Sequence, residues 1–255
     1  MRFRASGAAP LFLGRDGLTD VQKRDLDDLL NKIKITEIQA AKRDDLIKKR
    51  DAEPTLQAGA ITYVREVVNK YVYNYKESFS NRSTDKGTEV ESESIEIYNR
   101  LMFTNYKKLE EGDEFYELSY GSFTGHPDVV DKSKLFVLDI KSPETKKTFP
   151  KLPEDGENTT YEWQVKLYLY MLRMTSTLDW RHGEYAYVLT NTPEGMVGDW
   201  EEPSLHVMDD LSDNLRVTRV PVYLSDEDIV HIQMRELAAL RFGREYERKL
   251  LSKNG

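Results

Sequence analysis

Two short segments of the chain place acidic and basic side chains in a pattern that could bind a metal ion. One carries Asp128, and the other ends the apolar run 136–138 with Asp139 and Lys141 on either side of Ile140. In an extended strand, alternation sends Asp139 and Lys141 to one face while Ile140 points into the core. Paired carboxylates bind a hard divalent cation, and a lysine beside them can orient or help activate a water, or stabilise charge on a phosphate. This grouping suits metal-dependent cleavage of a phosphodiester.

Neither segment would carry this interpretation alone. A Pro-Asp pair such as 127–128 is usually a turn, and an Asp-x-Lys sequence is usually part of a surface strand. Here an apolar strand that should continue into the core delivers an acid and a lysine at its end. Because an unpaired buried charge is costly, these side chains need partners. We therefore interpret Asp128 and Asp139 as metal ligands.

Two predicted helices supply further polar candidates. Glu91 follows Gly87 by four residues in a first helical turn, where the helix dipole favours acids whatever their function. We expect Glu91 at the metal site, through a water. Gln164 and Tyr168 lie four residues apart and share a helix face. Such a glutamine is most often solvated or a cap, but here its amide could hold the attacking water or a phosphate.

Composition narrows the possible classes of protein. The 255 residues are 32% charged and 39% hydrophobic, which is ordinary for a globular protein. No apolar run approaches the roughly 18–20 residues of a membrane span, and no secretory signal is expected. The absence of cysteine excludes disulfides, thiolate zinc sites and cysteine-bound clusters, and a cytosolic setting fits. The net charge of −8 argues against a protein coated by nucleic acid, although a local basic groove remains compatible with it.

Segments 18–34 and 35–51 resemble each other with an offset of seventeen residues. Each opens with a threonine followed three residues later by a glutamine, a capping box that satisfies free amides at a helix start. Apolar residues with 3–4–7 spacing predict a buried stripe in the first segment. We predict a helical hairpin ending before Pro54, inserted on the core or over the substrate. The capping pairs are Thr19 with Gln22 and Thr36 with Gln39, and the stripe is Leu26, Leu29, Leu30 and Ile33.

The rest of the pattern predicts an α/β fold of mixed α+β type, with a central mixed sheet flanked by helices. No linker is long enough to separate independent domains, so we expect one domain over 1–255. In the helix 57–75 we expect Ile61, Val64, Val67, Val68 and Tyr71 to be buried. The other predicted elements are a loop at 78–86, a helix at 87–103, strands at 115–120, 123–130 and 135–140, a loop at 142–160, a helix at 161–177, strands at 185–190 and 215–224, and a helix at 226–252 capped by Ser225.

Four motifs occur in a fixed order: Gly-x-x-x-Glu (87–91), Pro-Asp (127–128), Asp-x-Lys (139–141) and Gln-x-x-x-Tyr (164–168). Together they resemble the PD-(D/E)xK nuclease superfamily and, within it, the phage lambda exonuclease and YqaJ-type recombination nucleases. The resemblance covers about 83–172. It is supported by Lys-Ser-Pro at 141–143, by the aromatic Trp163, and more weakly by the opening Phe3-Arg-Ala-Ser6.

The resemblance implies a restriction-endonuclease-like core and a role for each matched residue. In this interpretation the single nuclease domain (1–255) contains the hairpin insertion (18–52), a catalytic core (83–190) and a C-terminal helix (226–252). Mg²⁺, for which Mn²⁺ can substitute, would be held by Asp128, Asp139, the Ile140 carbonyl and Glu91. Lys141 would position or deprotonate the attacking water, with Gln164 in support. DNA contacts would come from Ser6, Lys146, Lys147 and Tyr168.

The same resemblance implies a Mg²⁺-dependent exonuclease acting on the ends of double-stranded DNA in the cytoplasm of a bacterium or phage-infected cell. It also implies a ring-shaped homo-oligomer and a single-strand annealing protein as partner, with no membrane. Two alternatives stay open: an endonuclease of the same superfamily, and a non-catalytic nucleic-acid-binding or assembly module built around the hairpin.

Overall fold

The computed structural model describes residues 1–14, 18–52, 55–75, 82–198 and 200–253. The chain divides into two compact units, which we describe one at a time. The first consists of Met1 with residues 10–72 and 230–255, and the second of residues 2–9 and 73–229. In the described parts of the chain, no helix combines the length and apolar composition that crossing a membrane requires.

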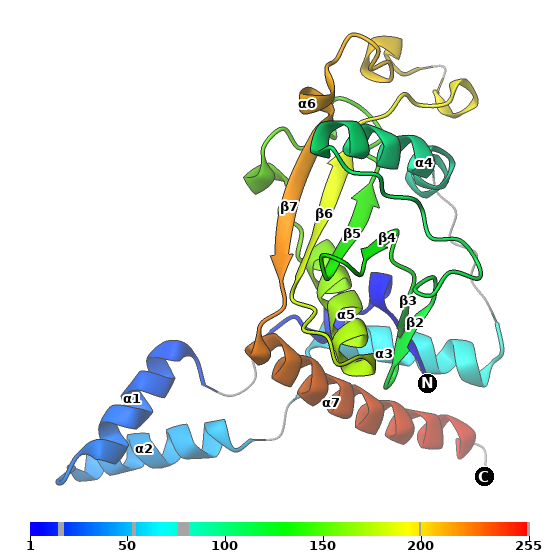
Figure 1. The fold of residues 1–255 in the computed structure, drawn as a ribbon. Coiled ribbons are helices and arrows are strands. Elements are labelled where there is room, and N and C mark those ends of the chain that lie inside the picture. Colours follow the sequence, from blue (N-terminus) through cyan, green and yellow to red (C-terminus); the bar gives the residue numbers. More distant parts are fainter. Residues whose placement is uncertain (15–17, 53–54, 76–81, 199, 254–255) are drawn as a thin grey trace. The chain divides into compact units, whose positions relative to one another are not determined.

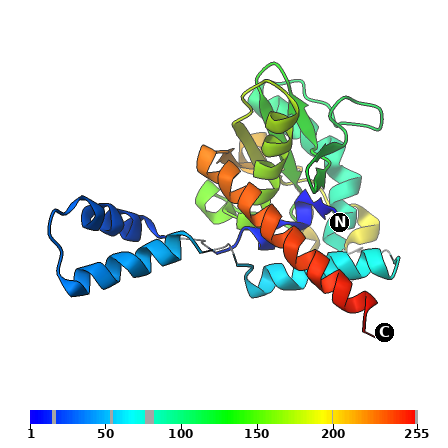
Figure 2. The same ribbon diagram turned by 90° about the horizontal axis from the view of Figure 1, so that it is seen from below.

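The predicted helical hairpin is present in the first unit. Its helices α1 (Asp20–Asn31) and α2 (Glu37–Arg50) lie side by side (Figures 1 and 2). Both begin with the predicted capping box, in which threonine and glutamine accept hydrogen bonds from each other's backbone amides. The stripe prediction was wrong for Leu30 and Ile33, which are 50% and 99% exposed. Leu30 is exposed because two packed helices bury only a narrow seam between them. Ile33 is exposed because it lies beyond the end of α1. The buried residues of the seam are Leu18, Leu26, Leu29 and Leu46.

Helices α3 (Ala58–Val72) and α7 (Asp226–Leu251, in this unit from Val230 onward) complete the first unit. The Arg65 guanidinium lies over the Phe242 and Tyr246 rings, at 5.8 and 5.4 Å from their centroids. Of the α3 residues predicted to be buried, Val64 and Val68 are buried and Ile61 and Val67 are half-buried. Tyr71 is 68% exposed, so that part of the prediction was wrong. The predicted capping serine of α7 is confirmed, because the Ser225 hydroxyl accepts from the Asp228 amide at 3.0 Å.

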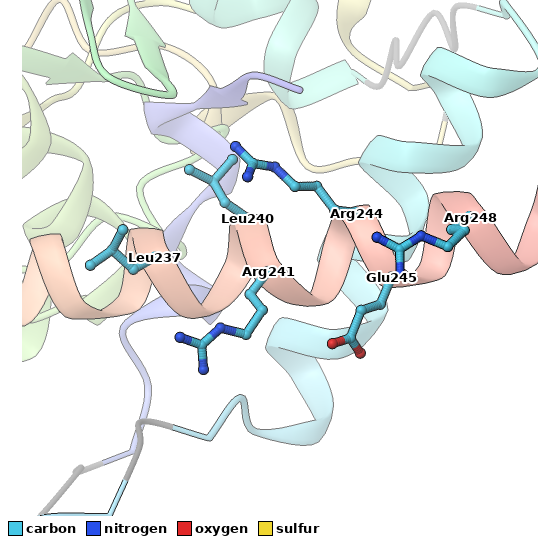
Figure 3. A pocket seen from close by; sticks show the side chains of 6 residues that line it. All are labelled: Leu237, Leu240, Arg241, Arg244, Glu245 and Arg248. Carbon is cyan, nitrogen blue, oxygen red and sulfur yellow. The ribbon is translucent and has the colours of Figure 1, made fainter.

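A shallow hollow of about 340 Å³ lies along α7 (Figure 3). One helix supplies every side chain that lines it, so it is an open depression rather than an enclosed pocket. Three of its residues are arginines and one is a glutamate, which is not a set of metal ligands. The lining residues are Leu237, Leu240, Arg241, Arg244, Glu245 and Arg248.

Two mixed sheets form the frame of the second unit (Figure 1). The three-stranded sheet has the order β1-β3-β2, with β1 parallel and β2 antiparallel to β3. The four-stranded sheet has the order β4-β5-β6-β7, in which β5 and β6 are parallel and both outer strands are antiparallel to their neighbours. The strands are β1 (Phe3–Arg4), β2 (Leu118–Tyr120), β3 (Phe123–Gly125), β4 (Val129–Asp131), β5 (Phe136–Lys141), β6 (His182–Val188) and β7 (Val217–Tyr223).

Helices α4 (Arg82–Met102) and α5 (Thr159–Thr175) cover opposite faces of the four-stranded sheet, and the short α6 (Asp213–Arg216) precedes β7. Ile140 of β5 belongs to the buried cluster that α4 contributes to. On the other face, Val165 of α5 lies so close to Gly183 of β6 that a β-carbon at position 183 would be only 2.7 Å from it. The prediction of a mixed sheet flanked by helices is confirmed.

The structure corrects two element boundaries that matter for the site. The predicted strand 123–130 is two strands in different sheets, because the chain leaves β3 after Gly125 and turns at 126–128 before β4 begins. Pro127 cannot donate a ladder hydrogen bond, which favours a break there. Residues 82–86, predicted as loop, already belong to α4, while 78–81 lie outside the described residues. The other elements lie where predicted within a few residues, although β2 begins only at Leu118.

Candidate active site

Strand β5 places Asp139 and Lys141 on one side of the sheet and Ile140 on the other. Ile140 lies in the buried cluster with α4, whereas Asp139 is bonded to Gln164 of α5. The predicted alternation is therefore present. Asp139 is 1% exposed, and its Oδ2 lies 2.6 Å from the Lys141 ammonium. The Lys141 ammonium also lies 4.5 Å from the centroid of the Tyr161 ring, a cation–π contact.

The turn before β4 brings Asp128 to the same end of β5. The ladder pairs Val129 with Leu138, so position 128 is the next one along, opposite 139. The Asp128 carboxylate reaches across to β5, where its Oδ2 accepts a hydrogen bond from the Ile140 amide at 2.5 Å. The Asp128 carbonyl in turn accepts from the Leu109 amide at 3.1 Å. Carboxylates from two neighbouring strands thus come together at one end of β5.

Gln164 links several of these groups. Its amide nitrogen donates to Asp139 Oδ1 at 3.0 Å and to the Tyr168 hydroxyl at 2.8 Å. Its amide oxygen accepts from the Lys141 ammonium at 3.1 Å. The Tyr168 hydroxyl donates to the His126 carbonyl at 3.0 Å. With both amide hydrogens and the oxygen in use, Gln164 is a buried connector that fixes Asp139 and Lys141.

Negative charge is concentrated here with little access to water. Burial raises the pKa of Asp128 well above its usual value, and the charges of Asp139 and Glu91 raise it further. Burial likewise raises the pKa of Asp139, although Lys141 opposes this. Burial disfavours the Lys141 ammonium, yet Asp139 and Asp128 outweigh that effect, so the pKa of Lys141 is raised and it stays a cation at neutral pH.

These carboxylates have the chemistry of a divalent-cation site. The Asp139 Oδ2 atom is buried, and the Lys141 ammonium at 2.6 Å is its partner among the described residues. A cation near Asp128 and Asp139 would offset the burial and the neighbouring negative charges that raise their pKa values. Within the described residues, however, no three His, Asp or Glu side chains come close enough together to hold a metal in the conformations present.

Glu91 has a different partner from the one that we expected. Its Oε2 accepts a hydrogen bond from the Lys108 ammonium at 2.7 Å. Its charge still acts on both aspartates, since it raises the pKa of Asp128 and of Asp139. Glu91 therefore lies beside the carboxylate pair without joining it, and its role as a metal ligand remains a prediction.

The N-terminal segment lies next to Tyr168. Burial and then the Asp139 charge raise the pKa of Tyr168, while the nearby Arg4 guanidinium opposes them. Gly125 allows this approach, because a β-carbon there would collide with the Tyr168 ring and lie 3.1 Å from the Ala5 side chain. Ser6 follows directly in the turn Ala5–Gly7 and is exposed. Its predicted contact with DNA remains a prediction.

The two lysines predicted to bind DNA lie in the loop after β5 and have local partners. The Lys146 ammonium lies 3.3 Å from Asp210 Oδ1, and the Lys146 amide donates to the Leu205 carbonyl at 3.0 Å. Lys147 is exposed. Among the described contacts, none joins either ammonium to Asp128 or Asp139. Their role in DNA binding also remains a prediction.

A buried lysine that the sequence reasoning missed fixes the start of this loop. Lys86 of α4 is 0% exposed, and burial lowers its pKa to about 8. Its ammonium uses all three donors on main-chain carbonyls and so ties α4 to the segment after β5 and to the end of β6. The acceptors are the carbonyls of Pro143, Glu144 and Thr190, at 2.9, 3.1 and 3.0 Å.

Sequence reasoning also missed Arg4, Lys108 and Tyr161. Lys108 belongs to a polar stretch of the sequence, where nothing distinguishes a lysine with a carboxylate partner from a lysine that only contacts water. Tyr161 carries a signal, since it lies three residues before Gln164 and hence on a neighbouring part of the same helix face. Arg4 could also have been found from the sequence, because it lies within the segment 3–6 whose serine was predicted to contact DNA.

One known protein family matches most of the chain. The family model of the PD-(D/E)XK nuclease superfamily matches residues 17–248. The chain belongs to the PD-(D/E)XK nuclease superfamily. Asp128, Asp139, Lys141 and Gln164, which belong to the motifs noted in the sequence, lie together at one end of β5. No curated protein sequence matches the chain significantly.

Solved structures agree with this nuclease in fold. A phage-related exonuclease from Haemophilus somnus 129PT superposes with a TM-score of 0.73 at 17% identity, covering 98% of this chain and 96% of the other. The alkaline exonuclease LHK-Exo from Laribacter hongkongensis gives a TM-score of 0.55 at 15% identity, covering 99% and 92%. Its complex with dAMP gives 0.55 at 14% identity. At these identities the likeness shows the shared fold.

Proposed function

We propose that this nuclease is a divalent-metal-dependent DNA exonuclease that removes nucleotides from duplex ends. The observation that carries the proposal is the pair formed by the half-buried Asp128 and the buried Asp139 beside the Lys141 ammonium. Burial raises the pKa of both carboxyl groups, and the charge of Asp139 raises that of Asp128 further. A divalent cation is the partner that such a pair fits. Mg²⁺ is the expected ion and Mn²⁺ a substitute.

Asp128, Asp139 and the Ile140 carbonyl would hold the ion, with Glu91 completing the set. When bound, the ion supplies a water of lowered pKa and neutralises charge at phosphorus. Lys141 orients the attacking water or stabilises the phosphate charge. Gln164 keeps Asp139 and Lys141 at a fixed separation through its hydrogen bonds to both. Tyr168 holds Gln164 in place by its hydroxyl.

Action on ends is supported by the exonuclease descriptions of two structural relatives and by the N-terminal segment beside Tyr168. Arg4 and Ser6 would contact the backbone near the terminal nucleotide, and Lys146 and Lys147 a more distant phosphate. Such contacts position DNA without reading its sequence. A ring-shaped homo-oligomer, a single-strand annealing partner and a cytoplasmic setting follow from the same resemblance as expectations.

The test compares two forms of one plasmid, covalently closed and linearised, in Mg²⁺ with an EDTA control. We expect the linear duplex to be shortened progressively while the closed circle persists, and EDTA to stop the reaction. Cleavage of the closed circle at a comparable rate would overturn the exonuclease proposal in favour of an endonuclease. Labels at the 5′ and 3′ ends, with and without a 5′ phosphate, then give the polarity.

A further inference from the structure

Lys108 is a second lysine beside the carboxylates, outside every motif of the sequence. It lies in the connection between α4 and β2, and its ammonium donates to Glu91 Oε2 at 2.7 Å. The hydrogen bond from the adjacent Leu109 amide to the Asp128 carbonyl fixes the main chain there at 3.1 Å. The main chain directly after Lys108 is thus bonded to the residue that carries one of the paired carboxylates.

The two lysines of the site are held differently. Lys141 is 20% exposed and is engaged by Asp139, Gln164 and the Tyr161 ring. Lys108 is 36% exposed, and Glu91 is its hydrogen-bond partner among the described residues. A lysine carries a compact charge on a flexible four-carbon stem. Lys108 can therefore move away from Glu91 at little cost, whereas Lys141 is fixed by several contacts.

Charge counting shows what such a movement would do. Three carboxylates (Asp128, Asp139 and Glu91) and two ammonium groups (Lys108 and Lys141) give a formal charge of −3 + 2 = −1. A divalent cation changes this to +1, which one phosphate of the DNA backbone would balance. A cation at Glu91 and the Lys108 ammonium repel each other, so binding of the cation weakens the ion pair between Lys108 and that carboxylate.

We propose that Lys108 competes with a divalent cation for the Glu91 carboxylate and, when the cation takes Glu91, turns its ammonium to a phosphate of the DNA backbone. The inference rests on the proposed function, because it assumes a cation site at Asp128 and Asp139. It assigns to Lys108 two effects of opposite sign. Lys108 weakens binding of the metal and strengthens binding of DNA.

The first measurement is calorimetric titration of the protein with Mn²⁺ in the absence of DNA. Lys108→Met keeps most of the length of the side chain and removes its charge, and should tighten Mn²⁺ binding by about threefold to tenfold. Lys108→Arg keeps the charge and should bind Mn²⁺ much as the wild type does. Lys107→Met is the matched control, since Lys107 is the exposed neighbour and its loss should change the affinity by less than about twofold.

A double-mutant cycle shows whether Glu91 carries the effect. In the Glu91→Gln background, Lys108→Met should no longer tighten Mn²⁺ binding, because the competition has been removed. The second measurement is binding of a labelled duplex in Ca²⁺, under conditions where a gel shows the DNA intact. There Lys108→Met should weaken DNA binding by about threefold to tenfold, with a shallower dependence on salt.

The outcomes separate the inference from the proposed function. Mn²⁺ binding that is unchanged or weaker in Lys108→Met, with a normal circular dichroism spectrum, overturns the inference while leaving the metal site intact. An unchanged DNA affinity overturns its second half. If the wild-type protein binds no Mn²⁺ at all, the proposed function itself fails. Should Lys108→Met misfold, Lys108→Gln with the same controls gives the same comparison.

Discussion

Replacing the buried Lys86 by methionine (Lys86→Met) should change how the stability of the protein depends on pH. Burial lowers the pKa of the Lys86 ammonium from 10.5 to about 8 in the folded protein. Below pH 8 both the folded and the unfolded chain keep the proton, so the full cost of burying the charge is present. Between about pH 8 and pH 10.5 the unfolded chain binds more protons than the folded one, and the free energy of unfolding rises with pH.

The size of this effect follows from the two pKa values. The difference between 10.5 and about 8, at ~1.4 kcal/mol per pH unit, gives about 3 kcal/mol. This is an upper bound, because three carbonyl oxygens accept from the ammonium and favour its charged form. Lys86→Met removes the titration but leaves these carbonyls without their donor, so we also expect it to be less stable than the wild type by ~1–3 kcal/mol at pH 7, below the titration.

Urea unfolding followed by circular dichroism at about pH 7, 8.5 and 10 measures both effects. The stability difference between the wild type and Lys86→Met should widen as the pH rises, in favour of the wild type. Lys147→Met, which removes an exposed lysine from the loop that Lys86 holds, corrects for the general effect of losing one charge. Parallel stability curves for the wild type and Lys86→Met would refute the account of a buried lysine with a lowered pKa.

Three further substitutions test how the site is supported. Gly125→Ala puts a β-carbon into the Tyr168 ring, so we expect the free energy of unfolding in urea to fall by ~1–3 kcal/mol and cleavage to slow. Wild-type values for both would contradict the close approach. Arg219→Met leaves the Glu184 carboxylate, which is 2% exposed, without its bidentate partner. We expect the free energy of unfolding to fall by about 2 kcal/mol, a figure reduced because Arg219 is itself 41% exposed, and an unchanged melting temperature would count against this pair. Gln164→Leu puts a side chain of similar size in place of the amide and removes its hydrogen bonds to Asp139 and Lys141. Single-turnover cleavage should slow by about 10²-fold with the fold intact, and an unaffected rate would show that the amide is dispensable.

The sequence predicted the elements whose patterns are local. The capping boxes of the hairpin and the Ser225 cap need only residues three apart, and the structure has all of them. The alternation at 139–141 depends only on strand geometry, and Asp139 and Ile140 lie on opposite faces as predicted. Patterns of this kind are set by backbone geometry and do not require knowledge of the rest of the fold.

The features that could not be predicted from the sequence depend on contacts between residues far apart in the chain. Nothing near Lys86 indicates that its acceptors stand 57, 58 and 104 residues away. The same holds for Glu91, which pairs with Lys108 across 17 residues of chain. Burial of Leu30 was predicted from helical spacing, yet spacing does not say how wide a seam the partner helix covers. Tertiary packing decides these cases.

The central claim, that Asp139 helps to hold the ion on which cleavage depends, is tested most directly by single-turnover digestion of an end-labelled linear duplex in Mg²⁺. Asp139→Asn keeps the shape of the side chain and should lower the rate by at least about 10³-fold. Asp131→Asn, two residues beyond Val129 on the neighbouring strand, should cleave at close to the wild-type rate. Cleavage by well-folded Asp139→Asn at the wild-type rate, or cleavage by the wild type that persists in EDTA, would contradict the account.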